Sequence, residues 1–378
     1  MINELPRCTA LLQQGIERGL HIGAQMSVSL QGRVVADFAV GLARDGKPLR
    51  TDHRMLWLSA GKPLLAVAIA QLWEQGRLTP EDLVADHIPE FAAHAKSGIQ
   101  IQNLLTHTHA YEPPAVDWPR LHWDEIIAQI CNARIPEGRV PGNYAAYDPQ
   151  TTWYLLAEIL QRITGEAFHA YVQREVLGSI RCQKASIGLP SGQYTSMLES
   201  DEIAPLHDTN HSARDQLDLR THQVPVWAGD NELRAHARNP GGGALGPARE
   251  LCAFYNMLSD LWNGVAGAGP LSPKTVRTMT ERSRSGLVDR TLHGRIDWGF
   301  GFLINSNRYG SETTPYGYGK YASESTFGHS GVQSTSAYAD PLQKLAVALI
   351  FNGLPGEPKH EKRNRELNTL IYEELALV

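Results

Sequence analysis

The order of hydrophobic and polar positions gives the chain strand-like ends and a helical middle. Residues 24–40 hold two short β-branched runs on either side of a Gln-Gly-Arg turn, which is typical of a β-hairpin. Residues 335–353 show the same pattern around an Asp-Pro turn. A helical period precedes the first hairpin, in residues 1–20, and follows the second, in residues 361–377. Both chain ends are therefore expected to contribute strands and a covering helix.

The region between the hairpins has a helical period, broken by loops that contain proline and glycine. Its clearest helical segments are 64–78, 153–165, 166–178 and 247–262. Residues 195–235 are instead polar and largely aperiodic. A loop of this length in a compact protein is typically a lid, a substrate-facing excursion or a mobile segment.

This order of elements predicts the α/β (α+β) fold class. We expect an antiparallel sheet made by both chain ends and flanked by the terminal helices, with a mainly helical domain inserted between them. Residues 1–55 and 290–378 would form the discontinuous sheet-plus-helices domain, and residues 56–289 the mainly helical domain. An active site is then expected in the cleft between the two domains.

Composition and charge narrow the classes of partner and compartment. With 378 residues, 42% of them hydrophobic and 20% charged, the chain is typical of globular proteins. Its 35 basic and 40 acidic residues give a net charge of -5, which disfavours nucleic acid and anionic membranes as partners. No apolar stretch reaches the ~18 residues of a membrane helix. Scattered cysteines without a CxxC pair, and an N-terminus without signal-peptide features, lead us to expect a cytoplasmic location.

The strongest chemical signal is an S-x-x-K pattern, Ser59 and Lys62, at the start of an apolar helical run. This spacing puts both side chains on one helix face, one turn apart. Pro63 suits a first helical turn, so Ser59 is expected at a helix N-terminus, where free amides favour a developing negative charge. Taken alone, the pattern is more typical of a capping serine followed by a surface lysine.

The same pair can make a nucleophile and its base. Ser59 becomes reactive only when a base takes its proton, and Lys62 can act as that base only when it is neutral. A pKa near 7 lies roughly three units below the lysine reference of ~10.4, a shift that costs about 4 kcal/mol. Only a buried, purpose-built site would tolerate that cost.

A second candidate is Tyr147, in the loop before the helical segment 153–165. Asp148 as N-cap and Pro149 at the first helical position would hold Tyr147 just outside the helix. A tyrosine there can relay a proton if a nearby ammonium lowers its pKa. Without the other motifs, a packed loop tyrosine is the simpler interpretation.

A third candidate is the segment from His329 to Val332, just before the second hairpin. An edge strand beside a helix N-terminus can supply a backbone N–H, here that of Val332, opposite the N–H of Ser59. The two would form an oxyanion hole for an acyl carbonyl. On its own, a His-x-Gly pattern also fits a turn before a strand.

Six motifs in register resemble the serine hydrolases of the class C β-lactamase and penicillin-binding-protein type, in particular their esterase and acyltransferase branch. The resemblance spans roughly residues 15–355. The motifs, in the family's order, are Ser59-Ala60-Gly61-Lys62; Leu104-Leu105-Thr106-His107-Thr108; Pro141-Gly142 to Tyr147; Gly241-Gly242-Gly243-Ala244-Leu245 before Ala248-Arg249-Glu250-Leu251; Trp298-Gly299-Phe300-Gly301; and Phe327-Gly328-His329-Ser330-Gly331.

The resemblance implies a β-lactamase/DD-peptidase-like fold and a role for each candidate. Ser59 would be the acyl-accepting nucleophile, and Lys62 and Tyr147 the proton-handling pair. Tyr147 is matched rather than Tyr144 because it lies immediately before the helix, as the family's tyrosine does. The residues implied to orient substrate and to donate the second oxyanion amide are His329, Gly331 and Val332.

Two departures from the family pattern change the expected substrate. The family's lactamases and peptidases place Asn two positions after the tyrosine, where this chain has Pro149. Their Lys-Thr-Gly, which presents a cation to the carboxylate of penicillins, is here His329-Ser330-Gly331. An imidazole near its reference pKa of ~6.5 is mostly uncharged at neutral pH. Recognition of an anionic β-lactam is therefore expected to be weak.

Competing sites are less well supported. The histidines at 107, 109, 207 and 211 lack the Glu of an H-E-x-x-H motif and are interpreted as solvated loop residues, so no metal is expected. The glycine run 241–243 lacks the Lys-Ser/Thr of a phosphate-binding loop, and no cofactor is expected. Three tryptophans in or beside loops are candidates to line an apolar acyl pocket: Trp118, Trp123 and Trp227.

The sequence thus predicts an esterase-like serine hydrolase that acts on a small-molecule ester or amide through an acyl-Ser59 intermediate. The alternative is a cytosolic transacylase that passes the acyl group to an amine or alcohol in small-molecule biosynthesis. A β-lactamase or DD-peptidase is less favoured. A non-catalytic binding protein is least favoured, because it has no physical need for Ser59, Lys62 and Tyr147 together. The sequence does not specify the acyl group, the acceptor or the oligomeric state.

Overall fold

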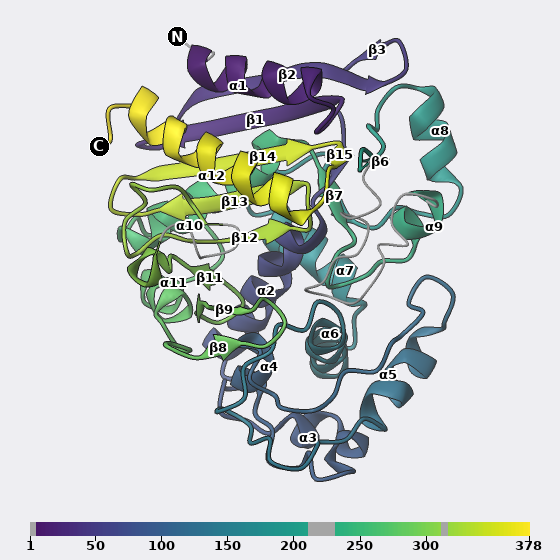
Figure 1. Cartoon of the computed structure of the whole chain (residues 1–378). Helices are drawn as coiled ribbons and strands as arrows, with labels where there is room; N and C mark the ends of the chain where they lie inside the picture. The colour runs from purple at the N-terminus through teal and green to yellow at the C-terminus, as the bar shows by residue number, and fades with distance from the viewer. Residues whose placement is uncertain (1–4, 211–230, 311–316) are drawn as a thin grey trace.

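The computed structural model describes residues 5–210, 231–310 and 317–378, and it contains an eight-stranded antiparallel sheet (Figure 1). The strand order is β10-β11-β12-β13-β14-β1-β2-β3, so strands from the end of the chain continue into strands from its beginning. The two groups meet where β1 pairs with β14, with Ala24 opposite Phe351. The bounds are β1 Gly23–Leu30, β2 Arg33–Arg44, β3 Lys47–Pro48, β10 Asp297–Trp298, β11 Leu303–Ile304, β12 Phe327–Gly331, β13 Thr335–Asp340 and β14 Leu345–Phe351.

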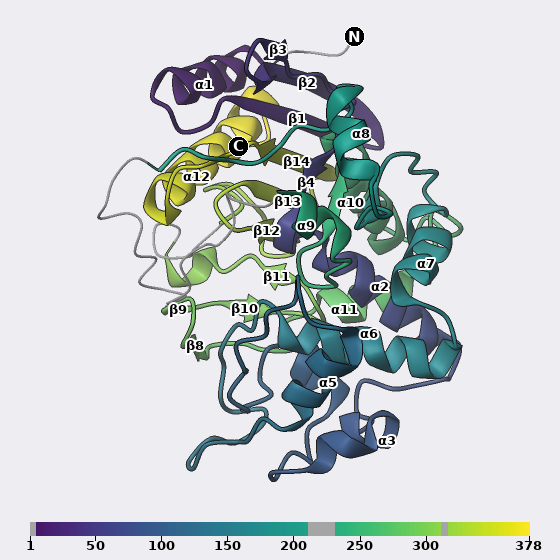
Figure 2. The ribbon, with the colours of Figure 1, turned by 90° about the vertical axis from the view of Figure 1, so that its right-hand side faces the viewer.

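Helices bury both faces of the sheet (Figure 2). Helices α1 (Pro6–Glu17) and α12 (Glu357–Glu374) lie against one face, and α10 (Ala248–Trp262) lies against the other. Alternation along β14 supplies both contacts, because successive side chains of a strand point to opposite faces. Its odd-numbered residues join the core with α1 and α12, and its even-numbered residues join the core with α10.

Helix α2 (Lys62–Glu74) runs through the helical region and is buried from Lys62 to Leu72, because its sequence is apolar almost all round. It packs against α6 (Thr151–Thr164) and against η3 (Val172–Leu177), a π-helical turn. The other helices are α3 Val84–His87, α4 Ile101–Leu105, α5 Trp123–Cys131, α7 Phe168–Tyr171, α8 Gln193–Glu199, α9 Asn231–His236 and α11 Pro273–Thr280, with 3-10 turns η1 Leu58–Gly61, η2 Pro89–Ala92 and η4 Asn307–Tyr309. The short strands are β4 Met55–Leu56, β5 Ser186–Ile187, β6 His207–Asp208, β7 Ala244–Gly246, β8 Val288–Asp289, β9 Gly294–Arg295 and β15 Gly353–Leu354.

The expected fold class is confirmed. Both predicted hairpins are present, as β1–β2 and β13–β14, and both terminal helices cover the sheet that they share. The domain boundaries at residues 56 and 289 stay a prediction. Within that range α10 packs against β1, β13 and β14, because its buried apolar stripe matches the small side chains on that face of the sheet. Among the helices that the structure describes, none combines the length and the apolar character needed to cross a membrane.

Two local expectations are wrong. The segment 195–235 is not wholly irregular, since parts of α8 and α9 and the strand β6 fall within it; residues 211–230 lie outside the described residues. Helix α6 begins at Thr151 and not at Pro149. Asp148 still caps it from a distance, because its Oδ1 accepts hydrogen bonds from the N–H groups of Gln150 and Thr151, both at 2.8 Å.

Candidate active site

Ser59 lies in η1, a tight turn that joins β4 to α2. A hydrogen bond of 2.8 Å from the Trp57 N–H to the Ala244 carbonyl anchors the start of this turn to β7. Leu58 adopts a φ of 51°, an uncommon left-handed conformation that concentrates at functional sites. Gly61 is required by close approach, since a Cβ there would lie 2.3 Å from the Cβ of Ala244. These constraints leave Ser59 partly exposed at the entry to a buried helix.

The structure brings three of the predicted site residues together. Lys62 Nζ lies 2.8 Å from Ser59 Oγ, and the Tyr147 hydroxyl donates a hydrogen bond of 3.0 Å to the same oxygen. Lys62 is fully buried and also donates to the carbonyl of Gly241. Ser59 Oγ therefore lies between an amine that can accept its proton when neutral and a phenol that donates a hydrogen bond to it.

Burial sets different charge states for the two neighbours of Ser59. It lowers the pKa of the Lys62 ammonium to about 7, and the nearby negative charge of Asp148 opposes this shift. Burial also raises the pKa of the Tyr147 phenol, against the lowering effect of its hydrogen bond to Ser59. The expectation that a nearby ammonium lowers the pKa of Tyr147 is therefore wrong, because desolvation of the phenolate dominates. Near neutral pH Lys62 can accept a proton and Tyr147 keeps its own.

Tyr147 is held by groups from several elements. Its N–H donates a hydrogen bond of 3.1 Å to Asp289 Oδ1, and Asp289 forms a fully buried ion pair of 2.9 Å with Arg284. The Tyr147 ring stacks on Trp298, with centroids 5.6 Å apart, and meets the edge of His107 at 4.8 Å. The aromatic contacts and the backbone anchor together restrict where the phenol can point.

The two histidines at 107 and 109 are buried, so their interpretation as solvated loop residues is wrong. His107 Nδ1 accepts a hydrogen bond of 3.2 Å from the Asp148 N–H, which ties its loop to the loop of Tyr147. Burial lowers the pKa of His107 well below its ordinary value and that of His109 to about 4, so both are neutral. His207 is only partly buried, and residue 211 lies outside the described residues.

Strand β12 places His329 and Gly331 beside η1. His329 is buried, and burial followed by the charge of Lys62 lowers the pKa of its imidazole to about 3. Its Nδ1 lies 2.9 Å from the Ser330 carbonyl, which can only accept, so Nδ1 carries the proton. A Cβ on Gly331 would lie 2.6 Å from the Trp57 carbonyl, so the strand reaches the nucleophile turn only because this residue is glycine.

The two backbone amides expected to face an acyl oxygen have no acceptor in the described part of the chain. Neither the N–H of Ser59 nor that of Val332 donates to another backbone or side-chain group there. Ser59 and Val332 are both partly exposed, whereas Gly331 is buried. Free donors beside a nucleophile are what an oxyanion hole requires.

Sequence reasoning missed the contribution of the glycine run 241–243. Gly241 receives the Lys62 ammonium on its carbonyl, and its N–H donates to Asn239 Oδ1 at 2.7 Å. A Cβ on Gly241 would lie 2.6 Å from the Pro149 carbonyl, which explains the glycine. The three consecutive glycines were a visible signal of close backbone approach, although they did not indicate which side chain they approach.

Among the described residues, the structure shows no group of three or more metal-ligating side chains. The tryptophans named as candidates to line an acyl pocket stay a prediction. Trp123 stacks on Phe168 with centroids 5.5 Å apart, and its indole N–H donates a hydrogen bond of 2.7 Å to Glu158 Oε2. Trp118 packs under the guanidinium of Arg234, and Trp227 lies outside the described residues.

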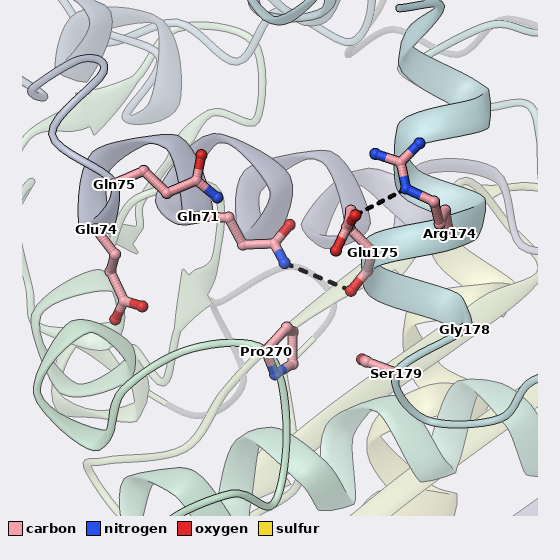
Figure 3. Close-up of a pocket in the computed structure, with 8 residues that line it drawn as sticks. All are labelled: Gln71, Glu74, Gln75, Arg174, Glu175, Gly178, Ser179 and Pro270. Carbon is pink, nitrogen blue, oxygen red and sulfur yellow. Dashed lines mark hydrogen bonds and ion pairs between the residues drawn. The ribbon is translucent and has the colours of Figure 1, made fainter. Parts of the chain in front are cut away.

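A separate cavity of about 700 Å³ lies at the far end of α2, between this helix and η3 (Figure 3). We call it the distal cavity. Gln71 donates to the Glu175 carbonyl across it at 3.4 Å, and Arg174 Nε pairs with the carboxylate of Glu175 at 2.8 Å. Its lining residues are Gln71, Glu74, Gln75, Arg174, Glu175, Gly178, Ser179 and Pro270.

Comparisons with known proteins agree on one family. The family model described as Beta-lactamase matches residues 9–370. Esterase EstB of Burkholderia gladioli is 23% identical over 377 residues, which cover 92% of this chain and 90% of that protein. A penicillin-binding protein homologue from Caulobacter crescentus has a TM-score of 0.79, with 24% identity and 98% of each chain covered. EstCE1, described as a hydrolase with promiscuous acyltransferase activity, has a TM-score of 0.75 at 20% identity, with 97% of this chain and 98% of that chain covered.

Proposed function

Because this chain belongs to the beta-lactamase family of serine hydrolases, we propose that it is an esterase-like hydrolase that acts on a small-molecule ester or amide through an acyl-Ser59 intermediate. The observation that carries the proposal is the position of Ser59 Oγ, 2.8 Å from Lys62 Nζ and 3.0 Å from the Tyr147 hydroxyl. A buried amine with a pKa of about 7 is the kind of base that makes a serine nucleophilic near neutral pH.

In the first step Lys62 takes the proton of Ser59 while Oγ attacks the acyl carbon. The N–H groups of Ser59 and Val332 would stabilise the oxyanion of the tetrahedral intermediate. The carbonyl then re-forms, the bond from the acyl carbon to the leaving oxygen or nitrogen breaks, and the leaving group takes up the proton that Lys62 had accepted, which makes Lys62 neutral again. Tyr147 is placed to pass that proton on, because its hydroxyl keeps its hydrogen near neutral pH and contacts Ser59 Oγ.

In the second step water attacks the acyl-serine. The water gives a proton to the neutral Lys62, the bond from Oγ to the acyl carbon breaks, and Ser59 Oγ takes that proton back from Lys62. The products are an acid and the unchanged enzyme. Hydrolysis therefore needs no group beyond those that acylate Ser59.

The chemistry of β12 favours a neutral substrate. A buried, uncharged His329 stands where the related β-lactamases present a lysine, and its low pKa keeps it uncharged at every physiological pH. An anionic substrate would meet no cation there. A β-lactamase or DD-peptidase is therefore a less favoured activity for this chain than an esterase.

A transacylase is the second candidate. In that reaction an amine or alcohol replaces water in the second step, and the same three residues carry the chemistry. The observation that favours it is the likeness to EstCE1, which is described as having promiscuous acyltransferase activity. The difference between the two activities lies only in which nucleophile reaches the acyl-serine.

The test uses p-nitrophenyl esters of increasing chain length, with and without added amines or alcohols, and mass spectrometry of the intact protein. We expect turnover, and a mass increase of one acyl group on Ser59 when the reaction is quenched early. Product that forms only with an added acceptor would favour the transacylase. No turnover and no adduct with any activated donor would contradict both activities and leave a non-catalytic binding protein.

A further inference from the structure

Asp148 is a carboxylate buried directly behind the nucleophile site. It follows Tyr147 in the chain, and only 1% of it is exposed. A buried carboxylate has to be satisfied by hydrogen bonds or by a partner charge. The contacts of Asp148 therefore show which groups its carboxylate interacts with.

The start of α6 satisfies the carboxylate without neutralising it. Oδ1 accepts from the N–H groups of Gln150 and Thr151 at 2.8 Å, and Oδ2 accepts from the N–H of Thr152 at 3.3 Å and from the Thr151 hydroxyl. Oδ2 also lies 3.8 Å from Nε2 of His109, whose imidazole is neutral. These hydrogen bonds compensate the carboxylate for the water that it loses on burial.

Lys62 lies close to the segment that holds Asp148, and the negative charge of Asp148 acts on the Lys62 ammonium against the effect of burial. Its Nζ lies 5.6 Å from the ring of Tyr147, the residue before Asp148, and 5.6 Å from the ring of Trp153 on α6. The imidazoles that act on the same region, His107 and His329, are both held neutral by burial. The groups that face Lys62 from the surrounding elements are Ser59 in η1, His107 after α4, Tyr147 before α6, Trp153 in α6, Gly241 before β7 and His329 in β12.

We propose that Asp148 is a positioning residue that acts through Lys62: its charge sets the pH range in which Lys62 can take the proton of Ser59. The inference rests on the proposed function, because it assigns Lys62 the part of base. Burial alone would lower the proton affinity of Lys62 so far that the amine would be a weak base. A permanent negative charge within the same buried region offsets part of that effect, and α6 holds the charge in place.

The test is the pH dependence of kcat/KM for a p-nitrophenyl ester in the wild type and in Asp148→Asn. Asn caps helices about as well as Asp, so the variant removes the charge and keeps most of the cap. We expect the acidic limb of the profile to move about one unit to lower pH, because Lys62 loses an opposite charge. The ratio of kcat/KM at about pH 6 to that at about pH 9 should then rise roughly fivefold.

Two further variants separate charge from structure. Asp289→Asn removes the other buried carboxylate beside Tyr147, which accepts a hydrogen bond from the Tyr147 N–H. Asp289 is not among the groups that change the pKa of Lys62, so the acidic limb of the pH profile should stay in place in this variant. Asp148→Ser is a second charge-free cap and should reproduce the shift if the Asn variant unfolds. A limb that does not move in a folded, active Asp148 variant would overturn the inference alone. A wild type without turnover would overturn the proposed function, and this inference with it.

Discussion

A cluster of polar side chains lies at each end of helix α2, and the cations of the two clusters differ in their environment. At the Ser59 end, the Lys62 ammonium is fully buried and contacts a hydroxyl and a carbonyl. At the other end, in the distal cavity, Arg174 is 57% exposed and binds the carboxylates of Glu166 and Glu175 at 2.6 and 2.8 Å. Burial without a partner carboxylate makes an ammonium easier to deprotonate, whereas a guanidinium that is exposed to water and paired with carboxylates stays charged.

The comparison shows which observation identifies a site. The distal cavity is lined by several polar groups, but two of them are bound to neighbours outside it: Glu74 accepts from the Ser272 N–H at 2.7 Å, and Ser179 donates to the Val176 carbonyl at 2.7 Å. The Ser59 end holds free backbone donors and a base near its neutral point.

The largest expected effect comes from removing the hydroxyl of Ser59, with Ser179 in the distal cavity as the matched control. Ser59→Ala should lower kcat/KM by at least about 10³-fold, because no other group can form the acyl intermediate. The melting temperature should stay nearly unchanged, as measured by calorimetry. Ser179→Ala is the matched variant in the distal cavity and should leave the rate unchanged. A large stability loss in Ser59→Ala would instead support a capping serine.

The next effect tests the cation at each end. Lys62→Arg should lower kcat/KM by about 10²–10⁴-fold, because a guanidinium stays charged and cannot accept a proton. Arg174→Lys, the reverse exchange at the exposed end, should have no measurable effect on rate. Steady-state kinetics at about pH 8 would measure both. Comparable losses in the two variants would break the distinction between the clusters.

A smaller effect appears in stability against pH. The Lys62 pKa of about 7 lies below its ordinary value, so between these two values the unfolded chain binds one more proton than the folded chain. This group therefore makes the free energy of unfolding rise with pH over that window, by at most ~1.4 kcal/mol per unit. Urea unfolding at several pH values should show that slope reduced in Lys62→Met and unchanged in Arg174→Met. Equal slopes in wild type and Lys62→Met would contradict the low pKa.

The smallest effect is expected from Glu74→Gln at the rim of the distal cavity. Glu74 is exposed, and its contact with the Ser272 N–H can be made equally by a glutamine oxygen. We expect the free energy of unfolding to change by less than about 0.5 kcal/mol and kcat/KM to stay the same. A marked loss of activity would show that the two ends of α2 are coupled, which the comparison does not anticipate.

Local patterns predicted the sheet and the heart of the site well. Short strand-like runs on either side of turn residues marked β1, β2, β13 and β14, and the i, i+3 spacing brought Ser59 and Lys62 together without any tertiary information. The need for a lysine pKa near 7 followed from the chemistry alone, and the structure supplies the burial that produces it.

What the sequence could not show depends on contacts between distant segments. The carbonyl of Gly241 reaches Lys62 across 179 residues, and no local pattern encodes such a meeting. His107 was interpreted as a solvated loop residue, yet it is buried and its ring meets the Tyr147 ring at 4.8 Å. The pKa of Tyr147 depends on how much water is removed from around it, a quantity that only the packed structure defines.

The strand order also has a consequence for synthesis on the ribosome. Gly23 hydrogen-bonds Asn352, 329 residues later, and β12, which directly precedes the proposed oxyanion donor Val332, is translated long after Ser59. Ser59 is therefore translated early, but Val332 reaches it only after the C-terminal strands have paired in the sheet. Under the proposed function, a chain truncated before Val332 would lack the second oxyanion donor and so would not be acylated efficiently.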